Sequence, residues 1–408
     1  MATSMELTTS YPPSKFQSDN DLNNDVVIEK YKAAGHILNA VFPEVLKYVS
    51  AGVSICDLCQ YGDDLITELT TTQHKNSERG IAVPTCVSVN NYIQYVSPLL
   101  DNDYRLKAGD VVKIELGVHI DGYIATAAHT TIISLDQSQP ITGPSADVLC
   151  ATHYASEAVL RMMKPGVKAS EITRVITEIA AYFRCKPVEN TYSSVIKRFV
   201  LKGGSDIENG FPEDMFVHDL EKYDFEIQAN QAYQLNIILT TGNGKTKSSE
   251  YKPFVYQRDV NKTYLLKMKS ARAAFNEINE KHTVFPFATR SLSSNKTRLG
   301  LASLLNNELI VSHPVLRSTS THDKVAHFKS TVLITPKEKV GVLRTTLPLP
   351  LPYVHSQYNI PDNTNAAQII GTPSVNRIKA SKGLPPVSAT FGERREEVED
   401  AEMDMDME

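Results

Sequence analysis

The segment Gly109–Ile133, GDVVKIELGVHIDGYIATAAHTTII, decides the fold of this chain. Two apolar runs, 111–116 and 123–133, are joined by His-Ile-Asp-Gly, and Asp121-Gly122 supplies the positive φ that a tight hairpin turn requires. The first run is apolar on both faces, which is typical of a strand inside a sheet. We therefore expect a β-hairpin with at least one central strand.

The composition indicates a folded protein of one large or two ordinary domains. The chain has 408 residues, of which 41% are hydrophobic. No apolar run approaches the roughly 20 residues of a membrane-spanning helix, and residues 1–20 lack the pattern of a secretory signal. Five cysteines are an odd and sparse set, which indicates a reducing compartment. We expect Cys56 and Cys59 to be buried thiols rather than a metal or redox site.

The net charge of −5 hides an acidic end. Glu396–Glu408 holds eight acidic residues and no basic one, so removing it from the net charge of −5 leaves +3 for the remainder. The folded part is therefore expected to be mildly basic, with an acidic tail appended.

A pattern of helix, turn and helix occurs twice. Apolar residues at steps of three and four predict a long helix that Asp25 caps, and a second helix runs from Ser54 to about Leu69. Ala51-Gly52 ends the first helix. The turn Gly52-Val53 recurs 114 positions later as Gly166-Val167, between two similar helices. A strand is expected over 80–89, and another hairpin is expected to begin with strand 232–240 and turn at 242–244. The order of elements predicts an internal duplication of helix, helix and sheet.

The remaining segments are read as tails and an insertion. Residues 1–24 are expected to be disordered, and so are residues 346–408, which are Pro-rich and then acidic. The main domain is expected over 25–345. Residues 257–321 fit neither repeat and predict a helical insertion, with helices at 264–278 and 299–309, before a last strand at 326–335.

Four stretches carry a resemblance to a known family. They are the hairpin, VSVNNYIQYVSPL (87–99), YQRDVNKTYLLKMKSARAAFNEI (256–278) and VAHFKSTVLITP (325–336). The chain resembles the proliferation-associated, ErbB-receptor-binding protein family, which comprises non-peptidase relatives of type 2 methionine aminopeptidase. The resemblance covers roughly residues 25 to 340. It implies an α/β (α+β) pita-bread fold with a pseudo-twofold duplication and a helical insertion.

The resemblance also implies a degenerate metal site. Type 2 methionine aminopeptidases bind two divalent ions with two Asp, one His and two Glu, and a further His lies near the substrate. The residues at these positions here are, in that order, Glu115, Thr126, Ser194, Asn236, Lys329 and, near the substrate, Tyr95. At about 4 Å and an effective dielectric near 20, one cation facing a dication costs roughly 8 kcal/mol. We therefore expect no catalytic residues, no metal and no cofactor, with Glu115 and Lys329 paired across the old cleft.

The insertion is the basic part of the chain, since Arg258–Arg298 holds nine basic and three acidic residues. We expect Lys262, Lys269 and Arg272 to share a helix face, which Leu265 and Leu266 interrupt. A basic surface without a base-reading motif suits phosphate contacts to structured RNA, whereas the alternative is an ordinary solvated helix face. The candidate RNA- or ribosome-binding residues are Arg258, Lys262, Lys267, Lys269, Arg272, Lys296 and Arg298.

The resemblance implies a cytoplasmic and nuclear, including nucleolar, protein that binds RNA and the large ribosomal subunit near the nascent-chain exit. Ribosome biogenesis, translation or growth regulation are the implied roles, and DNA and regulatory proteins are further partners described for the family. The acidic end departs from the family's lysine-rich end. Two alternatives remain: a residual metalloaminopeptidase that removes N-terminal Met, and a nuclear export factor for the large-subunit precursor.

Overall fold

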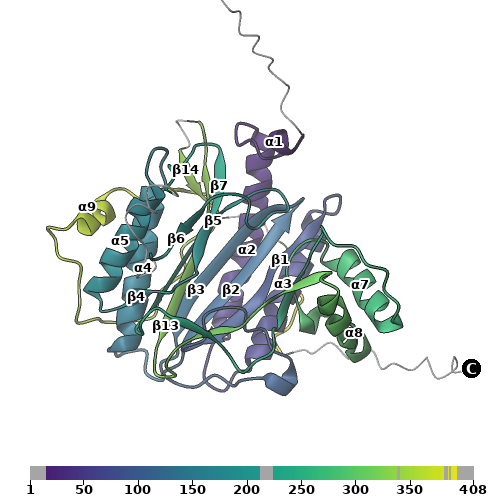
Figure 1. Ribbon diagram of the computed structural model, residues 1–408. Coiled ribbons are helices and arrows are strands. Elements are labelled where there is room, and N and C mark those ends of the chain that lie inside the picture. Colours follow the sequence, from purple (N-terminus) through teal and green to yellow (C-terminus); the bar gives the residue numbers. More distant parts are fainter. Residues whose placement is uncertain (1–14, 212–223, 338–340, 381–384, 386, 393–408) are drawn as a thin grey trace, which may run out of the picture.

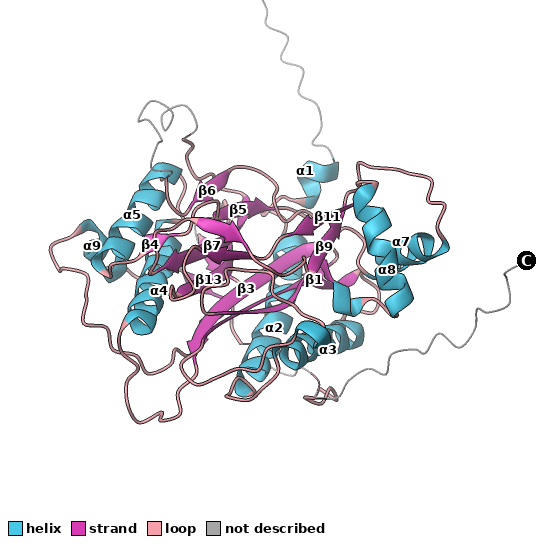
Figure 2. Cartoon of the chain, turned by 60° about the horizontal axis from the view of Figure 1, so that its bottom comes forward, coloured by secondary structure: helices cyan, strands magenta, loops and turns pink. Residues whose placement is uncertain are grey.

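A ten-stranded sheet forms the centre of the molecule, and two helix pairs cover one of its faces (Figures 1 and 2). The computed structural model describes residues 15–211, 224–337, 341–380, 385 and 387–392. The main path of the sheet runs in the order β1 (Arg79–Val89), β2 (Val111–Ile120), β3 (Tyr123–Ile132), β13 (Val325–Ile334), β7 (Gln231–Thr240), β5 (Tyr192–Ile196) and β6 (Asp206–Glu208). Three short strands join this path: β4 (Lys186–Pro187), β14 (Val342–Arg344) and β15 (Asn376–Arg377).

Strands β2 and β3 form the predicted hairpin. They pair in register from Val111 opposite Ile132 to Ile120 opposite Tyr123. Asp121 has a φ of 52° and Gly122 a φ of 80°, as the turn chemistry predicts. Every residue of β2 is buried, because helices cover one face of the strand and loops with the insertion cover the other.

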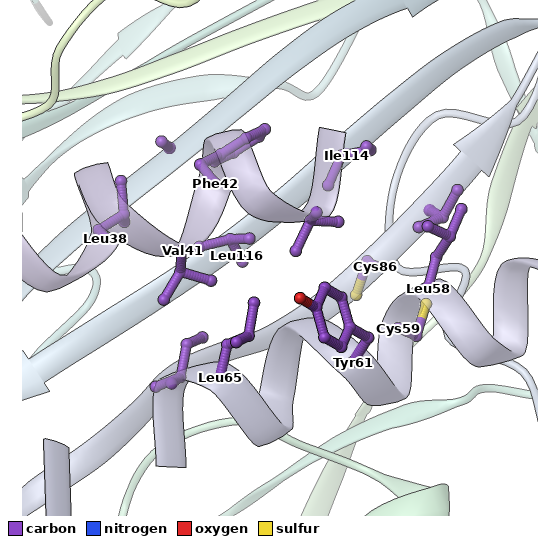
Figure 3. Packing of buried hydrophobic residues seen from close by; sticks show 14 of the residues in the cluster. Leu38, Val41, Phe42, Leu58, Cys59, Tyr61, Leu65, Cys86, Ile114 and Leu116 are labelled. Atoms are coloured by element: carbon purple, nitrogen blue, oxygen red, sulfur yellow. The ribbon is translucent and has the colours of Figure 1, made fainter. Parts of the chain in front are cut away.

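The helices form one pair for each half of the sheet. The first half has α2 (Asp25–Lys47) and α3 (Ile55–Gln73), and the second has α4 (Pro144–Met162) and α5 (Ala169–Tyr182). The helix cap is Asn24 rather than Asp25, since the Asn24 side chain accepts from the Val26 N–H. Figure 3 shows Leu38, Val41 and Phe42 of α2 in one buried cluster with Ile114 and Leu116 of β2. No helix among the described residues is long and apolar enough to cross a membrane.

The turns between the paired helices are near copies of each other. Gly52 and Gly166 have φ values of 89° and 88°, the left-handed region that favours glycine. The Gly52 N–H donates to the Leu106 carbonyl at 2.7 Å, and the Gly166 N–H donates to the Ile227 carbonyl at 3.0 Å. Two further bonds recur in the same order, Ile55 to Tyr104 and Cys56 to Asp103 in the first half, and Ala169 to Phe225 and Ser170 to Asp224 in the second. The sequence offset between the two turns therefore reflects a structural duplication.

Strand β7 does not form the expected hairpin. It pairs along its whole length with β13, from Gln231 opposite Ile334 to Thr240 opposite Val325. After the turn at 242–244 the chain enters β8 (Thr246–Ser248), which pairs with β12 (Leu316–Ser318) instead. The predicted turn at 242–244 is present, but the strand that pairs with β7 lies far along the chain, where local sequence cannot identify it.

The insertion is mixed rather than purely helical. Its helices are α7 (Lys269–Lys281) and α8 (Asn295–Asn306), and both begin at positions other than those predicted. A three-stranded sheet accompanies them, in the order β10 (Phe287–Ala288), β9 (Val255–Arg258) and β11 (Ile310–His313). Short 3₁₀ turns lie at Leu100–Asn102 and Thr289–Ser291.

A buried ion pair fixes the insertion to the first half. Arg290 of the insertion pairs with Asp63 of α3, and their side chains are only 4% and 6% exposed. The Arg290 Nε–H also donates to Ser97 Oγ at 3.0 Å. A guanidinium supplies several donors in a fixed fork, so this contact sets both the distance and the orientation of the insertion on α3.

Both expected tails contain more order than their composition indicates. The short helix α1 (Lys15–Asp19) and buried Leu22 precede α2, while residues 1–14 lie outside the described residues. Beyond 345 the chain packs Tyr358 against the second-half core, forms α9 (Asn365–Gly371) and places Phe391 on Tyr48. The acidic segment 396–408 lies outside the described residues.

Candidate functional site

Five of the six degenerate positions share the sheet face opposite the helix pairs. Register places Glu115 opposite Ala128 and Gly117 opposite Thr126, so Glu115 and Thr126 point to the same face. Lys329 of β13 lies opposite both Ala128 and Asn236, which puts Lys329 and Asn236 beside them. Ser194 of β5 lies opposite Gln234, two residues from Asn236 on the same face. Tyr95 approaches from the loop after β1 and lines the same cavity as Glu115.

Glu115 and Lys329 form a buried ion pair at the seam between the two halves. The Lys329 ammonium donates to Glu115 Oε1, and the side chains of Lys329 and Glu115 are 6% and 4% exposed. Among the described residues, Glu115 Oε2 has no hydrogen-bond partner. The expected pairing is therefore present in the structure, and the two formal charges cancel.

The neutral positions are held by hydrogen bonds to neighbouring strands. The Thr126 N–H donates to Thr331 Oγ1 at 2.9 Å, and Thr331 Oγ1 donates to the Thr126 carbonyl at 3.1 Å. Asn236 Oδ1 lies 2.6 Å from His327 Nε2. Burial, together with the ammonium groups of Lys329 and Lys113, holds the pKa of His327 well below its usual range, so its neutral ring donates Nε2–H to Asn236.

His327 was missed in the sequence. It stands two residues before Lys329, a spacing that places both side chains on one face of a strand. This spacing of two residues in a predicted strand could have identified His327 as a neighbour of Lys329 at the site. Ser194 Oγ, in contrast, is buried and has no hydrogen-bond partner among the described residues, so Ser194 shares the sheet face with the other positions without being bonded to any of them.

A cavity of about 560 Å³ opens over this face. Glu115 and Tyr95 line it, and the Tyr95 ring lies 5.0 Å from the ring of His313, centroid to centroid. Burial raises the pKa of Tyr95 well above its usual range, so its hydroxyl stays protonated. Burial, and then the positive charges of Lys202 and Lys329, lowers the pKa of His313 to about 4. Both rings are therefore neutral at pH 7.

The cations around the cavity differ in their pairing. Arg198 donates to Asp19 at 2.7 Å and to Asp121 at 2.6 Å, so its charge is balanced. Lys202 and Arg258 also line the cavity, but neither has an acidic partner in the part of the chain that the structure describes. The cavity wall therefore carries a net positive charge.

These residues do not fit a pair of divalent ions. The described residues contain no group of three or more His, Cys, Asp or Glu side chains placed to hold a metal. More directly, Glu115 is the one carboxylate among the six degenerate positions and is neutralised by Lys329, while Lys202 and Arg258 add positive charge nearby. Divalent ions need several oxygen or nitrogen ligands with balancing negative charge, which this face does not offer.

The candidate cations lie in four parts of the insertion: β9, the chain before α7, α7 and α8. Lys262 and Lys267 lie in the chain before α7, and Lys269 and Arg272 form the first turn of α7. The prediction that Lys262 shares a helix face with Lys269 and Arg272 is therefore wrong. Lys262 pairs with Glu308 at 2.6 Å, and among the described residues Lys267, Lys269 and Arg272 have no ion pair. The other candidates are Lys296 and Arg298 in the first turn of α8, and Arg258 at the cavity.

Cationic residues at a helix start need an explanation. The positive end of the helix dipole makes the first turn unfavourable for Lys and Arg. Yet α7 has no acidic residue in its first turn, and its N-terminal N–H groups lack a side-chain cap. Helix stability therefore does not account for Lys269 and Arg272, whereas an external polyanion would interact favourably with both cations and with the positive end of the helix dipole.

Comparison with known proteins gives matches in sequence over most of the chain. The model of metallopeptidase family M24 matches residues 29–220. Proliferation-associated protein A of Dictyostelium discoideum is 39% identical over 365 residues, which cover 89% of this chain and 93% of that protein. ERBB-3 binding protein 1 of Solanum tuberosum is 39% identical over 325 residues, which cover 78% and 82%.

Solved structures show the same fold. A thermophilic Arx1 superposes with a TM-score of 0.77 at 24% identity, covering 86% of this chain and all of that one. A methionine aminopeptidase from Thermotoga maritima superposes with a TM-score of 0.53 at 17% identity, covering 80% and 98%. The expected pita-bread aminopeptidase-like fold is thereby confirmed.

Proposed function

Since the chain belongs to the proliferation-associated, ErbB-3-binding protein family, whose fold is that of the M24 metallopeptidases, we propose that it is a non-catalytic member that binds structured RNA of the large ribosomal subunit. The observation that carries the proposal is the set of exposed cations Lys267, Lys269 and Arg272 at the start of α7, which have no ion pair with any described residue. Phosphates are the anions that such a site meets on RNA.

The cavity extends the proposed surface. Val260 begins the exposed chain before α7 and also lines the cavity that holds Lys202 and Arg258. Cations without an ion pair to any described residue thus continue from the insertion toward the old catalytic cleft. A long positive track suits a folded RNA backbone better than a small anion, because several phosphates are contacted together and each contact releases counterions.

Co-sedimentation with large ribosomal subunits tests the proposal. We expect the triple variant Lys267→Glu, Lys269→Glu, Arg272→Glu to bind much more weakly and to reduce the slope of log Kd against log salt concentration by about 2 to 3, since each lost phosphate contact removes about 0.9 from the slope. The matched control reverses Lys164, Lys168 and Arg174, which are exposed around α5 in the other half. Unchanged binding in the first triple variant, or an equal loss in the control, would refute the assignment.

Activity measurements decide between this function and the peptidase. We expect no release of N-terminal Met from peptides with added cobalt or manganese, because Lys329 neutralises Glu115, the one carboxylate among the six degenerate positions. Turnover that disappears in Glu115→Gln would establish the enzyme instead. The alternative role in nuclear export of the large-subunit precursor predicts nuclear accumulation when export is blocked, whereas a purely cytoplasmic ribosome factor stays outside the nucleus.

A further inference from the structure

The last described residues of the chain lie on α3. The N–H groups of Ser388 and Ala389 donate to the Glu68 carboxylate at 2.6 and 2.9 Å. Phe391 stacks on Tyr48 with 4.3 Å between ring centroids and meets Tyr61 edge to face. The acidic segment 396–408 therefore starts close to a fixed point on this helix.

The insertion is attached to the same helix. Asp63 of α3, which pairs with Arg290 of the insertion, lies within two turns of Tyr61 and Glu68. Figures 1 and 2 both show α3 on the side of the molecule that carries α7 and α8. Residues 393–408 can span at most about 50 Å when extended. Helices α7 and α8 of the insertion are each only about 20 Å long. The acidic segment can therefore reach the insertion.

The chain before α7 presents an uncovered apolar surface flanked by lysines. Val260, Tyr264, Leu265 and Met268 are 53%, 52%, 85% and 56% exposed. We call Val260–Lys269 together with Arg272 the insertion surface. Contiguous exposed apolar side chains usually mark an interaction site, and the cations at its edge are complementary to an anionic partner.

The acidic segment has the complementary chemistry. Its end, Glu402–Glu408, alternates acidic residues with Met403, Met405 and Met407. In an extended conformation such alternation puts all three thioethers on one side and the carboxylates on the other. Methionine adapts to irregular apolar surfaces, so a precise groove is not required.

We propose that residues 396–408 bind the insertion surface of the same molecule. The methionines cover Tyr264, Leu265 and Met268, and the carboxylates pair with Lys267 and Lys269. The contact occupies cations that the proposed function assigns to RNA, so the segment competes with RNA for them. This regulatory consequence rests on the proposed function, whereas the docking itself does not.

Carbodiimide cross-linking tests the docking directly, because it joins a carboxylate to an amine only when the two are in contact. We expect the full chain at low ionic strength to give cross-links from Asp404, Asp406 or Glu408 to Lys267 or Lys269. Mixing ¹⁴N- and ¹⁵N-labelled protein identifies the links as intramolecular. Links only to lysines elsewhere, such as Lys164, or links only between molecules, would overturn the docking.

RNA affinity tests the competition. With an effective concentration of about 1 mM and an intrinsic dissociation constant of about 0.1 mM, the segment weakens RNA binding about tenfold. Met403→Ser, Met405→Ser, Met407→Ser keeps every charge, so we expect it to lose the cross-links and to bind RNA up to tenfold more tightly. Unchanged affinity with lost cross-links would overturn the competition and indicate plain charge repulsion.

The two proposals fail in different ways. If neither the full chain nor the methionine variant binds RNA, the proposed function is wrong, and the cross-links still decide whether the segment docks. If both bind RNA equally and the cross-links to the insertion surface are absent, the docking is wrong and the RNA-binding function stands.

Discussion

Removing the ammonium from the buried pair should destabilise the protein strongly. The side chains of Lys329 and Glu115 are 6% and 4% exposed, so Lys329→Met leaves a carboxylate without a counter-charge in the interior. Stranding one member of a buried ion pair costs about 3 to 5 kcal/mol. Protonation of the stranded Glu115 relieves part of that cost, so the loss should be smaller at pH 5 than at pH 8.

A double-mutant cycle measured by urea unfolding isolates the pair. We expect Glu115→Gln, Lys329→Met to recover most of the stability, because an amide and a thioether fill the space without a buried charge, and the coupling free energy to be about 3 kcal/mol. The matched control is the pair Lys262 and Glu308, whose side chains are 50% and 70% exposed. Its coupling should be at most about 1 kcal/mol.

The result that refutes this reasoning is specific. If Lys329→Met costs no more than Lys262→Met, and if the coupling at the seam is below about 0.5 kcal/mol, then the two charges do not interact in a buried environment. The cavity floor would then carry a free carboxylate, and the argument against a metal at this site would lose its main support.

Three further predictions concern stability. His313 has a pKa of about 4 when folded and about 6.5 when unfolded, so the unfolded chain takes up the proton first and this residue lowers stability as pH drops below about 6.5. Its share of the loss at pH 5 is about 2 kcal/mol, and because other buried histidines such as His129 and His282 act in the same direction, His313→Gln should reduce the stability difference between urea titrations at pH 7.5 and 5 by about that amount. Arg290→Met strands buried Asp63 and should cost about 3 to 5 kcal/mol, with faster amide hydrogen exchange in α7 and α8 as the local sign. A Cβ added at Gly52 or Gly166 meets no atom within 4 Å, so only the left-handed backbone conformation opposes Gly52→Ala and Gly166→Ala. Each substitution should lower the free energy of unfolding by about 1 to 2 kcal/mol in thermal unfolding. Unequal losses would contradict the structural equivalence of the two turns.

The hairpin and the duplicated turns could be predicted because each depends on short-range chemistry. Asp121-Gly122 sets a turn that two apolar runs must close, and Gly52 and Gly166 occupy backbone conformations that glycine tolerates best. The pairing of Glu115 with Lys329 was also predictable, since family positions put opposite charges on one face. The contact itself depends on the strand register, which brings together two residues that are 214 positions apart in the sequence.

The partner of β7 and the start of α7 could not be predicted because each depends on contacts far along the chain. The sequence from Tyr264 to Met268 has enough apolar residues for a helix, yet only Leu266 of these is buried. The helix begins where Ala271 can pack against Gly300 of α8. The order of the segment beyond 345 was not predicted for a related reason. Proline-rich chain forms little regular structure, but single rings such as Tyr358 still pack against the core.

The position of β13 in the sheet bears on how the chain is made. Strands β3 and β7 each pair with β13 along one edge, and β13 is synthesised nearly 200 residues after β3. Until then each half has its own helix-backed core but presents an open strand edge, the kind of edge that recruits other chains. Premature termination within the insertion should therefore yield an aggregating fragment rather than a smaller folded protein, and chaperone dependence during synthesis should end when residues 325–334 emerge.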